Sequence, residues 1–271
     1  MTGPTSVAVA PVTGAANRGF TRILLSEWTK LRTVRSTMWA LITTIVLMIG
    51  AAAAIGMAAL GADENPAHPS FNVIELSFQG AVLAQLSLAT LGTLVITGEY
   101  RTGMIRTSLA AVPWRVRLLL AKALVFGGVA FVISMISAFG AFFVTQAILS
   151  ARYDAATLAD PHAFRVVFGA GLYLVATGLL GLGVGTLIRH SAGAITATVA
   201  ILFVLPPMLG ILPSSWSRTV TTYFPPNAGS QIAVVMPEPG MLSPWNGFSV
   251  YCLWIAAVFL AATYLLRHRD A

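Results

Sequence analysis

The sequence has 271 residues, of which 57% are hydrophobic and only 9% are charged. Soluble domains carry roughly 25% charged residues, so this chain has too few charges to cover the surface of a soluble fold of its size. The net charge of +7 is expected to follow loops on one side of a membrane, and we expect no nucleic-acid partner.

The N-terminal region divides into a tail and a helix. Residues 1–17 carry no charged side chain and no apolar core, which predicts a disordered tail and argues against a cleaved signal peptide. Residues 18–36 place apolar side chains opposite basic and hydroxyl ones, which predicts an amphipathic interfacial helix on the inner leaflet. Two roles stay open for it, a plain membrane anchor or a docking surface for a cytoplasmic partner. Its candidate residues are Phe20, Leu24, Glu27, Trp28, Lys30 and Leu31.

Residues 37–271 form the predicted transmembrane domain. A block of about 20 apolar residues spans a bilayer as a helix, so the sequence predicts an all-α membrane protein with six transmembrane helices. The third block is long for one crossing, and Pro206 and Pro207 predict a kink or an early exit in the fifth. The blocks are residues 38–60, 74–98, 120–149, 166–188, 192–212 and 246–266.

The basic residues predict the orientation. With the N-terminus inside, 13 of the 16 Lys and Arg residues lie in cytoplasmic segments, and the outer segments hold only Arg152, Arg165 and Arg218. Because cytoplasmic loops carry the excess of Lys and Arg, we expect a multi-pass protein with both termini in the cytoplasm.

The spans themselves lack charge. No charged residue lies deep within a block, and Glu99 and Lys122 are expected at block edges, where they reach water. Proton-coupled transporters and intramembrane aspartyl proteases need buried carboxylates or histidines, so both classes are disfavoured. Uphill transport would then take its energy from outside the membrane, although sodium coupling through carbonyls and hydroxyls stays open.

A polar stripe follows the second block. Its side chains gather on one face of the predicted helix, and such a face avoids lipid. It points to another helix, a second subunit or a translocation path, with packing between helices favoured. The stripe consists of Gln79, Ser87, Thr90, Thr93 and Thr97. In the fourth block, Gly181 and Gly185 form a small-xxx-small pair, which predicts close helix packing.

The longest cytoplasmic loop covers residues 99–117. Gly103 interrupts the chain, and the following residues permit a short helix that stops before Pro113. This coupling helix would present apolar side chains beside arginines, which suits a groove on a soluble protein, although the apolar face resting on lipid stays open. The candidate residues are Glu99, Tyr100, Arg101, Thr102, Gly103, Met104, Ile105, Arg106, Thr107 and Leu109.

The outer segment 213–245 is rich in Pro and Gly and contains a short apolar stretch at 232–236. Asn227, before this stretch, is predicted to cap a small helix that dips back toward the membrane. No catalytic pattern accompanies it. The sequence has no HExxH or G-x-S-x-G motif, and neither Lys30 nor Lys122 follows the glycine that a Walker A motif requires. Cys252 is the only cysteine. We therefore expect no catalytic residue, metal or cofactor in this chain.

Three segments resemble actinobacterial permeases of the ABC-2 exporter type. They are SEWTKLRTVRS at 26–36, EYRTGMIRTSL at 99–109 and PPNAG at 225–229, in the same order on a six-span frame. Met104 is a departure, because relatives often have Thr there.

The resemblance implies a subunit of six helices that pairs as a homo- or heterodimer. It also implies two separate cytoplasmic ATPase subunits per transporter, and these would hold the ATP and Mg²⁺. The N-terminal helix and residues 101–109 would contact the ATPases, with Glu99 and Tyr100 leading in. The second and fifth helices would line the path, which makes the polar stripe a candidate for that lining.

The resulting hypothesis is the permease subunit of an ATP-binding-cassette exporter in a bacterial plasma membrane. It would move a hydrophobic or amphipathic substrate by alternating access. One alternative is a non-transporting sensor or immunity module that recruits an ATPase. Another is an ion-coupled carrier or channel that works without ATP.

Overall fold

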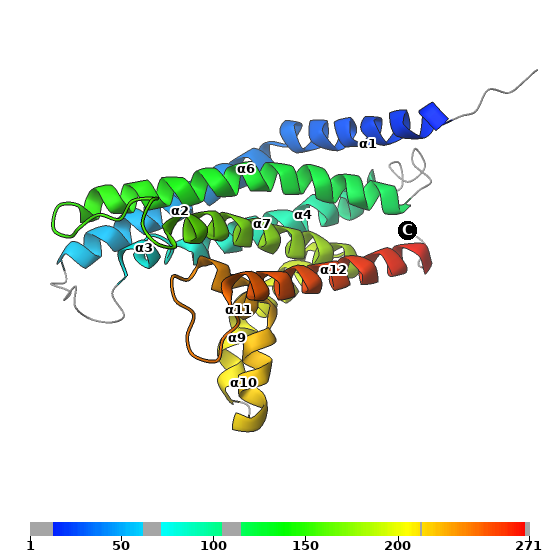
Figure 1. Ribbon diagram of the computed structural model, residues 1–271. Coiled ribbons are helices and arrows are strands. Elements are labelled where there is room, and N and C mark those ends of the chain that lie inside the picture. The colour runs from blue at the N-terminus through cyan, green and yellow to red at the C-terminus, as the bar shows by residue number, and fades with distance from the viewer. Residues whose placement is uncertain (1–12, 62–71, 105–114, 212, 269–271) are drawn as a thin grey trace, which may run out of the picture.

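The computed structural model describes residues 13–61, 72–104, 115–211 and 213–268 (Figure 1). Over these residues the regular secondary structure consists of helices, without a strand. Six helices are long and apolar enough to cross a membrane, so the predicted all-α class with six spans is confirmed. They are α2 (Arg35–Gly61), α4 (Ala81–Thr102), α6 (Arg115–Leu149), α7 (Ala163–Ile188), the composite span Ser191–Ile211 and α12 (Pro244–His268).

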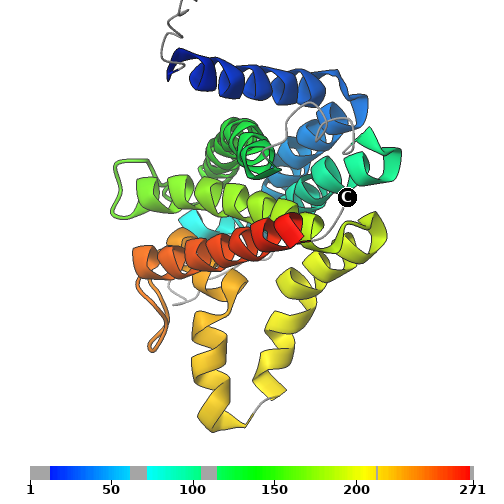
Figure 2. The ribbon, with the colours of Figure 1, turned by 90° about the vertical axis from the view of Figure 1, so that its right-hand side faces the viewer.

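The N-terminal helix α1 (Thr13–Thr33) begins earlier than the predicted residue 18 and ends just before α2. It lies across one side of the bundle (Figures 1 and 2) and packs against α6. The bundle end that holds α1, the end of α4 and the start of α6 is called the proximal end below. The opposite end, with the end of α6 and the start of α7, is the distal end.

The second span starts later than the sequence predicted. A short helix, α3 (Val73–Leu76), comes first, and the Asn72 side chain caps it by accepting hydrogen bonds from the amides of Ile74 and Glu75. Turns follow, and α4 begins only at Ala81. Gln79 therefore lies in a turn rather than on the face of the second span.

Helix α4 ends at Gly103, whose φ of 72° is left-handed and costs a glycine little. The fifth span changes its winding along its length, at the place where the prolines were predicted to disturb it. It runs from α8 (Ser191–Val199) through a π-helical segment to α9 (Leu205–Met208) and η2 (Leu209–Ile211). The π-helical segment is Ala200–Val204, directly before Pro206 and Pro207.

The connection between the fifth and sixth spans contains α10 (Ser214–Tyr223), α11 (Pro225–Ser230) and η3 (Gln231–Ala233). The prediction that Asn227 caps a helix is wrong, because α11 starts at Pro225 and encloses it. Proline suits the first helical position, since its missing N–H is not needed there. Asn227 instead donates a hydrogen bond to the carbonyl of Thr221.

Helix α7 forms the centre of the bundle, and α4 packs directly against it. A Cβ at Gly92 would lie 2.1 Å from the carbonyl oxygen of Gly178, and one at Gly181 would lie 2.2 Å from that of Ala89. The two backbones touch, which confirms that Gly181 serves helix packing. In the most apolar stretch of α7, 83% is buried inside the bundle, compared with 17% in the fifth span. The fifth span extends away from the bundle with α10 (Figure 2).

Candidate functional site

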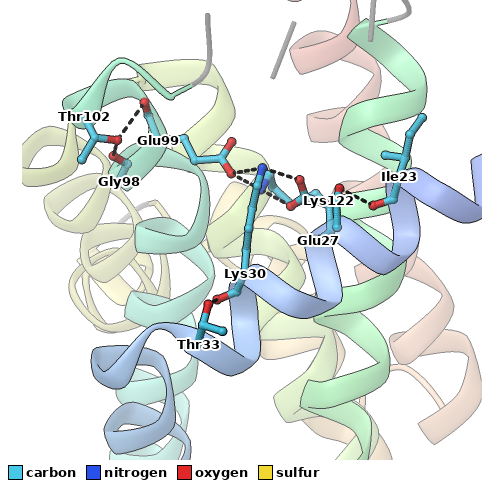
Figure 3. A network of polar contacts seen from close by, with 9 residues as sticks. Ile23, Glu27, Lys30, Thr33, Gly98, Glu99, Thr102 and Lys122 are labelled. Atoms are coloured by element: carbon cyan, nitrogen blue, oxygen red, sulfur yellow. Dashed lines mark hydrogen bonds and ion pairs between the residues drawn. The ribbon is translucent and has the colours of Figure 1, made fainter. Parts of the chain in front are cut away.

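Four charged side chains from three helices meet at the proximal end (Figure 3). Lys30 Nζ of α1 lies 2.7 Å from Glu27 Oε1 and 3.0 Å from Glu99 Oε1 at the end of α4. Lys122 Nζ of α6 lies 2.9 Å from Glu99 Oε1 and also contacts Glu27 Oε2. Each lysine thus touches both glutamates. We call these four residues the charge ring.

Local structure brings the ring together. Glu27 and Lys30 are three residues apart, so they share one face of α1. Glu99 lies in the last turn of α4, and Lys122 lies two turns inside α6. The ring is flanked by an apolar cluster, in which Ile96 and Leu118 are buried against Ile23 and Tyr100.

The ring is buried, which corrects one prediction. Glu99 and Lys122 were expected to reach water, but their side chains are only 8% and 3% exposed. Helix α1 covers them, and its own Glu27 is 2% exposed. Only Lys30 keeps some contact with solvent. Buried charges are tolerated when each finds an opposite charge, and the ring satisfies this condition with two carboxylates and two ammonium groups.

The two ring members in α1 stay charged at neutral pH. Burial by itself would raise the pKa of Glu27, but the attraction of Lys122 and hydrogen bonds from both lysines outweigh it, so that the pKa lies below its usual value. Burial would lower the pKa of Lys30, but hydrogen bonds to Glu27 and Glu99 outweigh it and raise the pKa. The ring therefore contains ion pairs rather than neutral partners.

The predicted residues of α1 divide between two environments. Leu31 and Glu27 are buried against the bundle, whereas Phe20, Leu24 and Lys30 are partly exposed. Trp28 is half exposed and lies off the buried face. The sequence pattern placed Trp28 on the apolar side. It gave no sign that a glutamate forms the centre of the buried face.

The predicted coupling segment is described only in part. Arg101, Thr102, Gly103 and Met104 are exposed at the end of α4, directly after the ring. Tyr100 packs in the apolar cluster beside the ring, and the guanidinium of Arg189 lies 5.4 Å from the centre of its aromatic ring. Ile105, Arg106, Thr107 and Leu109 lie outside the described residues.

The polar stripe does not stay together. Ser87 accepts a hydrogen bond from Thr44 of α2 at 3.0 Å. Thr93 lies 3.2 Å from the carbonyl oxygen of Gly181 in α7, and Thr97 accepts a hydrogen bond from Ser191 of α8. Thr90 bonds within its own helix, and Gln79 is exposed in its turn. The structure thus brings Thr93 and Thr97 together against α7 and α8, and places Ser87 against α2.

Two further polar contacts inside the bundle were missed by the sequence analysis. Gln85 of α4 donates a hydrogen bond to Tyr173 of α7 at 2.8 Å. One turn further along α7, the Thr177 hydroxyl lies 3.1 Å from that of Tyr251 in α12. These contacts link the two central helices to the sixth span. Gln85 is a polar residue inside the second block, and this signal was not used in the sequence analysis. Tyr173, Thr177 and Tyr251 look like ordinary members of apolar blocks, so the sequence carries no signal for their contacts.

The geometry suits transmission of movement between helices. The charge ring joins α1 to the two helices on either side of residues 105–114, so a displacement of α4 and α6 would carry α1 with it. The ring is an arrangement of ion pairs rather than a ligand set for a metal, since each of its two carboxylates is already in contact with two ammonium groups. Among the described residues, no group of three or more His, Cys, Asp or Glu could hold a metal ion.

Comparison with known proteins supplies the family. The family model described as ABC-2 family transporter protein matches residues 23–214, which include all four ring residues and the first five spans. A search of the curated proteins found no match. The family match covers well over half of the sequence. The chain therefore belongs to the ABC-2 family of transporter proteins and is the membrane permease module of an ABC transporter.

Proposed function

We propose that this chain is the permease subunit of an exporter that is powered by separate ATPase subunits and moves a hydrophobic or amphipathic substrate by alternating access across a bacterial plasma membrane. Family membership supports the ATP-driven class. The apolar spans support the substrate class, because few charged groups are available to solvate a hydrophilic cargo. The charge ring carries the proposal, since it connects the helices around the expected coupling segment.

The proximal end is the cytoplasmic end in this proposal, and the ATPase subunits bind there. They contact the exposed face of α1 and residues 101–109, and hold the ATP and Mg²⁺. Closure of the ATPases on ATP pulls residues 101–109, and the ring makes α4, α6 and α1 respond together. Rocking of packed helices of this kind is a common form of transport movement.

A second permease subunit completes the proposed transporter, either identical or related. The support for it is the fifth span, which leaves the bundle together with α10 and buries little of its surface (Figure 2). Met208, Ile211 and Trp216 are exposed along this hairpin. A partner permease packed against the hairpin would hold it in place, whereas the described bundle alone supports it weakly.

Co-purification tests the proposal. The tagged chain is extracted from its native membrane in gentle detergent, and a soluble P-loop ATPase should accompany it. Arg101→Asp together with Met104→Asp should remove the ATPase, whereas Arg218→Asp on α10, which projects away from the bundle, should not. A folded, dimeric permease without any ATPase would favour an ion-coupled carrier or channel. An ATPase that binds but is never stimulated by substrate would favour a non-transporting module.

A further inference from the structure

A short strap of backbone is clamped at the distal end by a charged side chain. The strap is residues 232–235, which run from η3 into extended chain before α12. Arg165, near the start of α7, donates hydrogen bonds to three strap carbonyls. Its Nη1 lies 3.2 Å from the Ile232 oxygen and 3.0 Å from that of Val234, and its Nη2 lies 2.9 Å from that of Val235.

A second charged side chain holds the strap from another element. Glu75 Oε1 of α3 accepts a hydrogen bond of 2.7 Å from the Val235 amide. Arg165 and Glu75 are both described and form no ion pair with each other. Both charged side chains therefore hydrogen-bond to the backbone of the strap, which lies between them.

The strap also rests directly on α7. A Cβ at Gly169 would lie 2.5 Å from the carbonyl oxygen of Ile232, so only glycine allows this approach. The Ile232 side chain is fully buried. Beyond the strap, Met236 is 77% exposed, so the buried path of the chain ends there.

The clamp defines two possible states of the strap. The carbonyls of Ile232, Val234 and Val235 and the amide of Val235 bond to side chains of other elements, and such backbone groups need either protein partners or water. Arg165 and Glu75 supply these partners now, and water at the end of the bundle can supply them if the strap lifts. A segment whose backbone groups can bond either to the clamp or to water can exist in a closed and an open state, and the strength of the clamp sets the balance between them.

The clamp also joins the elements that must part if the distal end opens. It connects α3, which leads into α4, with α7 and with the chain leading into α12. The same three spans meet inside the bundle through Gln85, Tyr173, Thr177 and Tyr251. We propose that the strap is a distal gate, that Arg165 and Glu75 are its clamp, and that it opens to release substrate; this inference rests on the proposed exporter function.

Cysteine modification tests the clamp in the full chain. Open membrane fragments expose both faces to the reagent, and Cys252→Ser removes the only cysteine. Ile232→Cys then reports opening, because a maleimide reaches residue 232 only when the strap lifts. Met236→Cys is the matched control, since this residue is exposed already.

We expect Arg165→Gln to speed modification of Ile232→Cys about tenfold or more, because the loss of one charge-assisted hydrogen bond shifts an equilibrium by roughly that factor. Arg165→Lys should give an intermediate rate, since an ammonium cannot bridge the carbonyls as a guanidinium does. Arg218→Gln, on an exposed arginine of α10, should change nothing. An unchanged Ile232→Cys rate in Arg165→Gln would overturn the clamp. If Arg165→Gln fails to insert into the membrane, Glu75→Gln tests the clamp instead, through the same modification rate of Ile232→Cys.

The gate is tested with the partner ATPase bound. ATP should raise the modification rate of Ile232→Cys while Met236→Cys stays constant. An unchanged rate during ATP hydrolysis would overturn the gate. If no ATPase binds, the exporter proposal fails and the gate fails with it. The clamp is judged separately, because the Arg165 comparison needs no nucleotide.

Discussion

Replacing Lys122 with methionine should destabilise the protein far more than the same replacement at Lys30. Both lysines contact the same two glutamates, so the number of ion pairs lost is equal. They differ in solvent access, since the Lys122 side chain is 3% exposed and the Lys30 side chain is 29% exposed. Methionine has a similar length and no charge, so the packing volume is largely kept.

The expected magnitudes follow from this difference. Without Lys122, two buried carboxylates share one lysine at the edge, and breaking a buried ion pair in this way costs about 3–5 kcal/mol. Without Lys30, Lys122 still bridges Glu27 and Glu99, and water replaces part of the lost interaction. Partly exposed pairs contribute about 0–1 kcal/mol, so Lys30→Met should cost little more than that.

Thermal unfolding in detergent, followed by circular dichroism, measures both variants. Adding Glu99→Gln to Lys122→Met restores a neutral ring and should recover part of the loss, giving a coupling free energy above about 1 kcal/mol in a double-mutant cycle. Equal small effects of Lys122→Met and Lys30→Met, with no coupling to Glu99→Gln, would show that the ring does not form in the membrane protein.

Three further predictions concern pH, packing and coupling. The pKa of Glu27 is lowered in the folded protein, so the stability that this carboxylate contributes is present above its ordinary pKa of 4.5 and is lost as pH falls through the folded pKa. A series of melting curves against pH should show this loss of stability, and Glu27→Gln should abolish the pH dependence. Gly92→Ala should cost about 1–3 kcal/mol in the same melting assay, because its Cβ meets the Gly178 carbonyl, whereas Gly98→Ala in the same helix meets no atom and should be neutral or slightly stabilising. Ile105→Asp or Arg106→Asp should abolish ATP-driven transport in vesicles without affecting membrane insertion, and normal transport in both would contradict the coupling role.

The six spans were predictable because each depends on its own composition. A bilayer requires long apolar helices whatever their neighbours are, so hydropathy alone located α2, α6, α7 and α12. The start of α4 was not predictable in this way. The apolar block continues through Phe78 into the turn, and hydropathy cannot distinguish a turn from a helix when both are apolar.

The candidate site was predictable only in outline. The end of the second span was singled out, and Glu99 lies there. The ring depends on contacts between residues far apart in sequence, since Lys122 and Glu27 are 95 residues apart. Lys122 could have been suspected, because a lysine inside the apolar start of a span needs a partner. Its partner could not be named from one sequence, because more than one carboxylate, Glu27 and Glu99 among them, is expected near the same membrane face.

The polar contacts have a common arrangement that bears on mechanism. In the contacts described above, the charged groups lie toward the two ends, at the ring and at the Arg165 clamp, while the middle of α4 and α7 is joined by glycine contacts and neutral hydroxyls. A helix pair with backbone contact over several turns resists bending and moves as one body. Charges at its ends can exchange partners with water during such a movement, whereas charges in its middle would have to cross lipid. In the proposed exporter, the central pair would therefore rock between two positions as one body, with the ring transmitting force at one end and the strap determining when the other end opens.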